Sequence, residues 1–413
     1  VVVPRAALVG SAPDSAEVEK SNGEFVVLEG GTFTSFAGSD GVKLEFRPLV
    51  DSDLPPFVLD RWRQAGIDAL LSKRSQTALQ RMETPVIYFY SDVEREVEVK
   101  VEFPQGLITE YFPPVESQYP PAFDTGKEAP AVPGVDWGRF RVIPNRQLTT
   151  HVADPRLASA VNRRVVDALP PYVHGDSHYL PARETDSAMV YVHRPADPQR
   201  PGTPQGDFFE RFLFYRGIGN FDLPLAVEAR GGGKLTAANT GPNALRSLFL
   251  VNVEGKTVRF ERIEQIDPGQ SITIDVAALA GDADELAEAL VDALVEERLY
   301  EKEARAMVAT WRSSWFGEEG TRLFYTLPAA VTEELLPLQI SPKPDELVRV
   351  LVGRLEVMTP EDEERMARVV RRNANKRASV ARRTKGKSAD PANTPVPLPR
   401  DILKIGRLAE PML

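Results

Sequence analysis

Short segments in which apolar and polar residues alternate, separated by glycine- and proline-rich turns, recur along most of this chain. Successive side chains of a β-strand point to opposite faces, so such a segment predicts a strand that is buried on one face only. The clearest segment has apolar residues at Val97, Val99, Val101 and Phe103, with charged residues between them. We therefore expect a mostly β protein, and 413 residues are enough for several domains.

The neighbours of this strand extend the pattern. Apolar segments at residues 85–90 and 107–112 predict strands that pair with it as a meander. Residues 56–82 instead carry apolar residues at helical spacing, which predicts a long amphipathic helix that Pro85 ends.

Residues 208–276 contain evenly spaced short strands, separated by turn signals such as the glycines at 231–233. The strands are expected at residues 208–215, 223–229, 235–240, 247–253, 257–263 and 271–276. Short strands at this spacing are typical of an all-β sandwich.

Three motifs of this segment resemble those of a known family. They are Asn239-Thr240-Gly241, Leu248-Phe249-Leu250-Val251 and Pro268-Gly269-Gln270-Ser271. They resemble the immunoglobulin-like adhesion modules of bacterial surface proteins, in which an asparagine–glycine turn and a proline–glycine turn bracket the central strands. The resemblance covers residues 208–276 only, and it implies a structural or binding module without catalytic residues.

Helices are expected toward the C-terminus. Asp282 with Glu285 makes a capping pair at a helix start, and Thr359-Pro360 begins a second helix. Trp311 and Trp315 are one helical turn apart, which predicts a buried face that packs the helix onto its domain.

These patterns predict a multidomain layout with helical connectors. The expected regions are a β-rich N-terminal region with one long helix at 1–150, a histidine-bearing connecting segment at 151–207, an immunoglobulin-like sandwich at 208–278, an α+β C-terminal region at 279–360, and a basic helix with a proline-rich extended arm at 361–413.

Composition excludes several classes of protein. The absence of cysteine removes disulfides, thiolate nucleophiles and cysteine-ligated metal sites. Fifty basic against sixty acidic side chains give a net charge of −10, which argues against a dedicated nucleic-acid-binding protein. No stretch of about eighteen apolar residues predicts a transmembrane helix. The apolar start at Val1-Val2-Val3 and the lack of cysteine favour an exported protein, at the periplasm or the cell surface.

All four histidines fall between His151 and His193. A divalent transition metal prefers two or three imidazoles together with a carboxylate. The predicted ligands of such a metal are His174, His178, His193, Glu184 and Asp186. The spacing matches no established zinc signature, so histidines gathered in a loop without a metal are the alternative.

A second signal is a block of positive charge. Residues 365–387 hold ten basic side chains and no acidic one, so the rest of the chain is more acidic than the whole. We expect this block to be disordered when free and to bind an acidic surface. The predicted contact residues are Arg368, Arg371, Arg372, Lys376, Arg377, Arg382, Arg383, Lys385 and Lys387.

The sequence therefore favours a non-enzymatic structural or interaction subunit, without a cofactor, which assembles with copies of itself or with other proteins through extended arms. Two alternatives remain open. One is a metal-dependent hydrolase at His174, His178 and His193. The other is binding of nucleic acid or another anionic polymer through residues 365–387.

Overall fold

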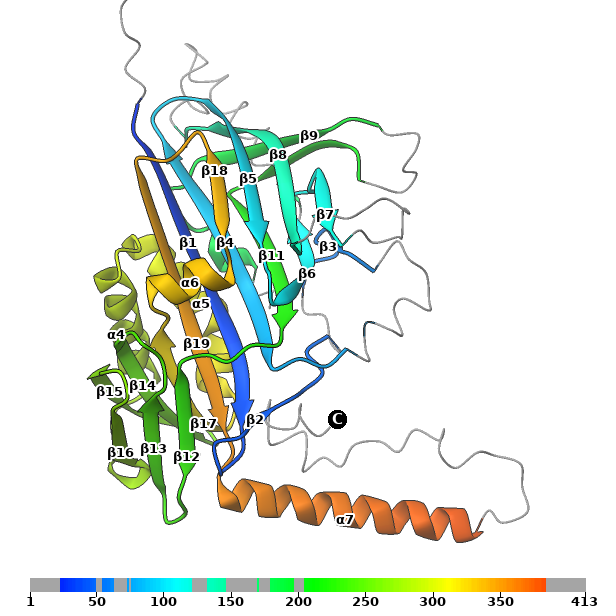
Figure 1. Ribbon diagram of the computed structural model, residues 1–413, viewed down its shortest axis with the longest axis vertical. Coiled ribbons are helices and arrows are strands. Elements are labelled where there is room, and N and C mark those ends of the chain that lie inside the picture. The colour runs from blue at the N-terminus through cyan, green and yellow to red at the C-terminus, as the bar shows by residue number, and fades with distance from the viewer. Residues whose placement is uncertain are drawn as a thin grey trace, which may run out of the picture.

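The computed structural model describes residues 23–49, 54–62, 73, 76–120, 132–145, 169–170, 179–196 and 204–383 (Figure 1). This part of the chain is mostly β, and its strands form three sheets. No helix among these residues is long and apolar enough to cross a membrane.

A ten-stranded sheet forms the centre of the molecule. Its strands, in spatial order, are β15 (Thr257–Ile266), β14 (Leu245–Glu254), β17 (Gly320–Thr326), β19 (Glu346–Val357), β1 (Phe25–Ala37), β4 (Gln80–Ser91), β11 (Phe212–Gly219), β6 (Gly106–Phe112) and β3 (Leu59–Asp60), with β2 (Lys43–Leu44) beside β1. β1 and β19 run parallel, and the other described pairs of this sheet are antiparallel.

Two smaller sheets cover one face of the central sheet. The larger contains, in order, β10 (Gly206–Glu210), β9 (Met189–Arg194), β8 (Gly134–Ile143), β5 (Arg95–Glu102) and β18 (Leu338–Ser341), with β7 (Ser117–Tyr119) beside β8. The smaller contains β12 (Leu225–Ala229), β13 (Lys234–Asn239) and β16 (Ser271–Asp275). Their inward-facing residues, such as Val99 and Val227, share one core with Phe33 of β1.

Helices cover the opposite face. α4 (Ala283–Glu296) and α5 (Glu301–Gly317) pack on it with the short 3₁₀ helix η1 (Leu180–Arg183), and they bury a second core there. η2 (Val276–Ala278) and α6 (Ala329–Leu335) are short connectors, and α7 (Pro360–Arg383) projects away from the end of the central sheet (Figure 1).

The helix ends follow local capping. Asp282 accepts hydrogen bonds from the backbone N–H groups of Asp284 and Glu285, which confirms the predicted start of α4. The predicted buried face of α5 is also confirmed, because Trp311 and Trp315 are fully buried.

The expected immunoglobulin-like sandwich is wrong. The strands of residues 208–276 lie close to their predicted positions, but they are divided among all three sheets. β11 is buried along its whole length because it lies between β4 and β6 in the central sheet, whereas β12 and β13 pair with β16 in the small sheet. Long-range pairing, which strand spacing does not encode, decides this arrangement.

Two expectations in the N-terminal region are also corrected. Residues 80–82 begin β4 instead of ending a helix, and β4 continues through Pro85. Residues 107–112 do form a strand, but β4 and β6 pair with β11 in the central sheet and not with β5, whose described partners are β8 and β18. The domain boundaries expected from the sequence stay predictions.

Pro85 is tolerated in an inner strand because it lies at a β-bulge. The pairing of β1 with β4 shifts between Gly30 and Thr32, opposite Thr84 and Pro85. Thr84 has a φ of 45°, a left-handed conformation that non-glycine residues rarely adopt. A Cβ on Gly30 would lie 2.5 Å from Met307 Cε of α5, so a glycine there lets α5 approach the sheet closely.

Candidate functional site

The predicted metal ligands lie only partly among the described residues. His174 and His178 are outside them. His193, on β9, is mostly exposed and its Nδ1 lies 2.8 Å from Asp207 Oδ1. Glu184 is exposed, and Asp186 accepts a hydrogen bond from Lys302 Nζ at 2.7 Å. No group of three potential ligands occurs among the described residues, so the metal site stays a prediction.

The predicted basic block lies largely on α7, which continues as a helix to Arg383. Arg368, Arg371 and Arg372 are exposed there, and Arg368 pairs with Glu364 at 3.1 Å. The side chains of Lys376, Arg377, Arg382 and Arg383, and the whole of Lys385 and Lys387, lie outside the described part of the chain.

α7 is fixed to the body at its first turns. Thr359 and Asp362 cap it reciprocally: Thr359 Oγ1 accepts from the Asp362 N–H at 3.1 Å, and Asp362 Oδ2 accepts from the Thr359 N–H at 3.1 Å. Glu363 accepts a hydrogen bond from the Ser39 N–H at 2.7 Å, and Met366 packs with Phe36. At about 1.5 Å a residue, the 24 residues of α7 extend about 36 Å.

A row of buried charged residues crosses the helix-covered face of the central sheet. They lie on β6, β11, β4, β19 and β17, except for Lys73, which pairs with Glu110, and we call them the charged row: Lys73, Glu110, Arg216, Arg81, Glu83, Arg354, Glu356 and Arg322. Cross-strand register brings them together, since Glu110 is opposite Arg216 and Arg322 is opposite Glu356.

Each carboxylate of the charged row has a described partner. Glu356 accepts from Arg354 Nε at 2.6 Å and from Arg322 Nε at 3.2 Å. Glu83 accepts from Thr34 Oγ1 at 2.7 Å, and Glu110 from Lys73 Nζ at 2.7 Å. The row is therefore suited to fixing strand register and offers no free acid or base.

The ion pairs of Lys73 with Glu110 and Asp60 change the pKa of its amine. Burial lowers the pKa of this amine, but the negative charges of Glu110 and Asp60 outweigh burial, so its pKa is raised and it stays charged.

The sequence analysis missed the charged row, although a signal was present. Arg81 and Glu83, like Arg354 and Glu356, are opposite charges two residues apart on a strand, so they share one face. Polar residues at alternate strand positions usually indicate a face in contact with water, and only the observed packing of α5 shows that this face is covered.

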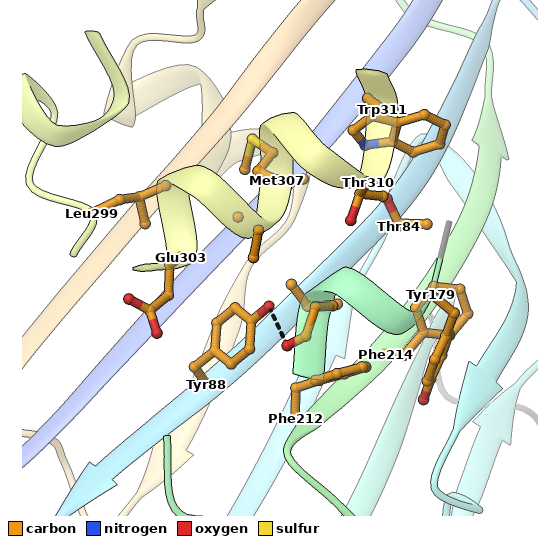
Figure 2. Close-up of a pocket in the computed structure, with 15 residues that line it drawn as sticks. Thr84, Tyr88, Tyr179, Phe212, Phe214, Leu299, Glu303, Met307, Thr310 and Trp311 are labelled. Carbon is orange, nitrogen blue, oxygen red and sulfur yellow. Dashed lines mark hydrogen bonds between the residues drawn. The ribbon is translucent and has the colours of Figure 1, made fainter. Parts of the chain in front are cut away.

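A cavity lies next to the charged row, between α5 and the sheet. Side chains from α5, β4, β11 and η1 line it, together with the bulge at Gly30, Gly31 and Thr84 (Figure 2). Its volume of about 20 Å³ is about what one water molecule needs. The lining is mostly apolar and aromatic.

Two buried carboxyl groups lie at or near this cavity. Glu303 of α5 lines it, and burial raises the pKa of this carboxyl. Glu210 receives hydrogen bonds from Arg183 at 2.7 Å and from Tyr179 at 3.1 Å. Burial raises the pKa of Glu210 in spite of the opposing charge of Arg183.

Comparison with known proteins gives only structural likenesses. No protein-family model matches the chain, and no curated protein is significantly similar in sequence. The mu-homology domain of Fcho1 from Danio rerio, solved with a bound Eps15 peptide, is similar at a TM-score of 0.32 and 8% identity, over 81% of this chain and 97% of that domain. The yeast delta-COP-I mu-homology domain complexed with the Dsl1 WxWxV peptide has a TM-score of 0.24 and 7% identity, over 81% of this chain and 96% of its own.

These comparisons correct three expectations together. The similar structures are mu-homology domains from zebrafish and yeast, whereas the sequence predicted an immunoglobulin-like module of a bacterial surface protein. The expectation of a bacterial protein depended on that resemblance, and the expectation of export to the periplasm or cell surface depended on the apolar start and the lack of cysteine; both are wrong. Alternating strands are common to many β folds, so they do not identify a source or a location.

Proposed function

We propose that this chain is a non-enzymatic interaction subunit that docks through α7 onto an acidic protein surface, of a second copy or of another protein. The observation that carries the proposal is a helix that is fixed to the body by its first turns and then projects from it (Figure 1). Its exposed Arg368, Arg371 and Arg372 leave the projecting part strongly basic.

The composition of α7 favours an acidic protein over a lipid surface. Helices that lie in a membrane interface usually carry Trp, Phe or Leu on the apolar face. Residues 360–383 contain none of these, and their apolar residues are Met, Val and Ala. Two α7 helices would repel each other because both are basic, so the partner surface is acidic.

The test reverses charge on α7. We expect R368E/R371E/R372E to bind poly-L-glutamate at least about tenfold more weakly than the unchanged chain, which corresponds to about 1.4 kcal/mol. The matched control is K234E/K256E/R259E, which changes three exposed basic residues elsewhere and should bind like the unchanged chain.

Sizing at low and high salt completes the test. Assembly through α7 predicts a larger species at low salt that dissociates at high salt, and the α7 variant should lose it. A monomer at both salts, combined with poly-L-glutamate binding that charge reversal leaves unchanged, contradicts the proposal. Binding to duplex DNA that is much tighter than to poly-L-glutamate would replace the protein partner by nucleic acid.

A further inference from the structure

The outward face of α4 carries carboxylates and no basic side chain. The exposed residues of this helix are Asp284, Glu285, Glu288, Asp292, Val295 and Glu296. Glu288, Asp292 and Glu296 are each four residues apart, so their side chains follow one row along the helix. At about 1.5 Å a residue, this face extends about 18 Å from Asp284 to Glu296.

Only part of this negative charge is neutralised within the chain. The carboxylates that pair with an arginine are Glu288 with Arg305 at 3.1 Å, Glu296 with Arg262 at 2.7 Å, and Asp284 with Arg312. Glu285 and Asp292 have no ion-pair partner among the described residues. The exposed face of α4 therefore keeps an excess of negative charge.

The spread of these carboxylates suits an extended partner. No three potential metal ligands come together among the residues that the structure describes, so the carboxylates of α4 do not converge on one ion. They follow the helix instead, and Val295, which is 41% exposed, lies on the same side seven residues after Glu288. A basic helix that lies along α4 would meet the carboxylates and cover Val295, which an ion would not do.

α7 carries the complementary charge at the same spacing. Arg368 and Arg372 are exposed and four residues apart on this helix, and Arg371 is exposed beside them. Helices that pack at a small crossing angle bring such rows of side chains alongside each other. Opposite charges at equal spacing can therefore pair along both helices.

The two surfaces of one chain do not meet. α7 begins at the end of the central sheet and extends away from α4 (Figure 1). Its described contacts with the body lie in its first turns, through Glu363 and Met366. Each chain therefore offers both a basic helix and an acidic helix face to a second copy.

We propose that the exposed face of α4 is the acidic surface to which α7 of a second copy binds. The inference rests on the function proposed for α7 and narrows its partner to a copy of this chain. Two copies that exchange α7 reciprocally form a closed dimer, whereas copies that bind in series form a longer assembly. Both arrangements use the same contact.

The test reverses the charge of each surface in turn in the full-length chain and measures mass by sizing with light scattering at low salt. The unchanged chain should form a species larger than a monomer, and R368E/R371E/R372E and E285K/D292K should each be monomeric. D222K/E334K reverses two exposed carboxylates outside α4 and should assemble like the unchanged chain.

Mixing the two monomeric variants tests the contact directly. The reversed α7 of one variant is complementary to the reversed α4 of the other, and their unchanged surfaces are also complementary. An equimolar mixture should therefore restore the larger species that neither variant forms alone.

A thermal melt of each variant confirms that it is folded before sizing. The inference is overturned if the unchanged chain is a monomer at low salt, if E285K/D292K assembles like D222K/E334K, or if the mixture stays monomeric. If E285K/D292K does not fold, E285Q/D292Q decides, because it removes the charge without reversing it, and assembly like that of the unchanged chain refutes the site.

Binding to poly-L-glutamate separates this inference from the proposed function. E285K/D292K keeps α7 unchanged and should still bind the polymer. A chain that binds the polymer through α7 but does not assemble has another acidic partner, so only the inference fails. A chain whose polymer binding does not depend on the α7 arginines contradicts the proposed function itself.

Discussion

Glu303 makes the stability of the molecule depend on pH. Burial raises its pKa above the ordinary value of 4.5, so the folded state holds this proton more tightly than the unfolded state. The resulting stabilisation is complete below about pH 4.5 and is lost as pH rises through the raised pKa. E303Q should therefore gain stability relative to the unchanged chain as pH rises, measured by urea unfolding at several pH values. A difference that is independent of pH would contradict this assignment.

Glu356 is the shared counter-charge of two buried arginines. E356Q removes the carboxylate that Arg322 and Arg354, both 0–1% exposed, share, and among the described carboxylates it leaves Arg354 with Glu318 at 3.0 Å. Removing one partner of a buried ion pair costs about 3–5 kcal/mol, and we expect a loss in the free energy of unfolding of that order.

The matched control for this loss lies on the same strand. Glu346 pairs with the exposed Arg298, so E346Q should cost less than about 1 kcal/mol. Urea unfolding of both variants is the measurement, and equal effects would show that the charged row does not stabilise the sheet.

At the scale of single residues, the sequence predicted features with local causes. The cap at Asp282 and the burial of Trp311 follow from positions three to four residues apart in one helix. The pairs of opposite charges in the charged row are visible in the sequence, but their burial was not predictable, because it depends on α5, which begins more than two hundred residues beyond Arg81.

Among the helices, the end of α4 offers a test of backbone conformation. Arg298 has a φ of 77° just after the helix, and its N–H bonds the Val295 carbonyl at 2.8 Å. Glycine is preferred at this position because it adopts a left-handed conformation without steric cost. We expect R298G to raise the free energy of unfolding by about 1 kcal/mol. The same change inside α5, R305G, should lower it by about 1 kcal/mol. Thermal melts measure both, and a destabilised R298G would refute the argument.

Strand positions were predictable, but strand partners were not. The alternation at β5 and the turns around β12 and β13 are encoded within a few residues, and the structure has these strands where the sequence placed them. The residues close to a strand in the sequence do not identify the strand with which it pairs. β1, for example, pairs with β19, which is more than three hundred residues away in the sequence. An even series of strands was therefore assigned to one sandwich when it belongs to three sheets.

For the whole molecule, the proposed function requires that the projecting part of α7 is dispensable for folding. The described contacts of α7 with the body lie in its first turns, through Glu363 and Met366. A chain that ends after Arg368 should keep the melting temperature of the full chain and lose binding to poly-L-glutamate. M366A keeps the basic residues but removes a buried side chain packed with Phe36, Phe46 and Met358, and should cost about 2–5 kcal/mol. If the truncated chain melts as early as M366A, the end of α7 belongs to the fold, and its arginines stabilise the body instead of meeting a partner.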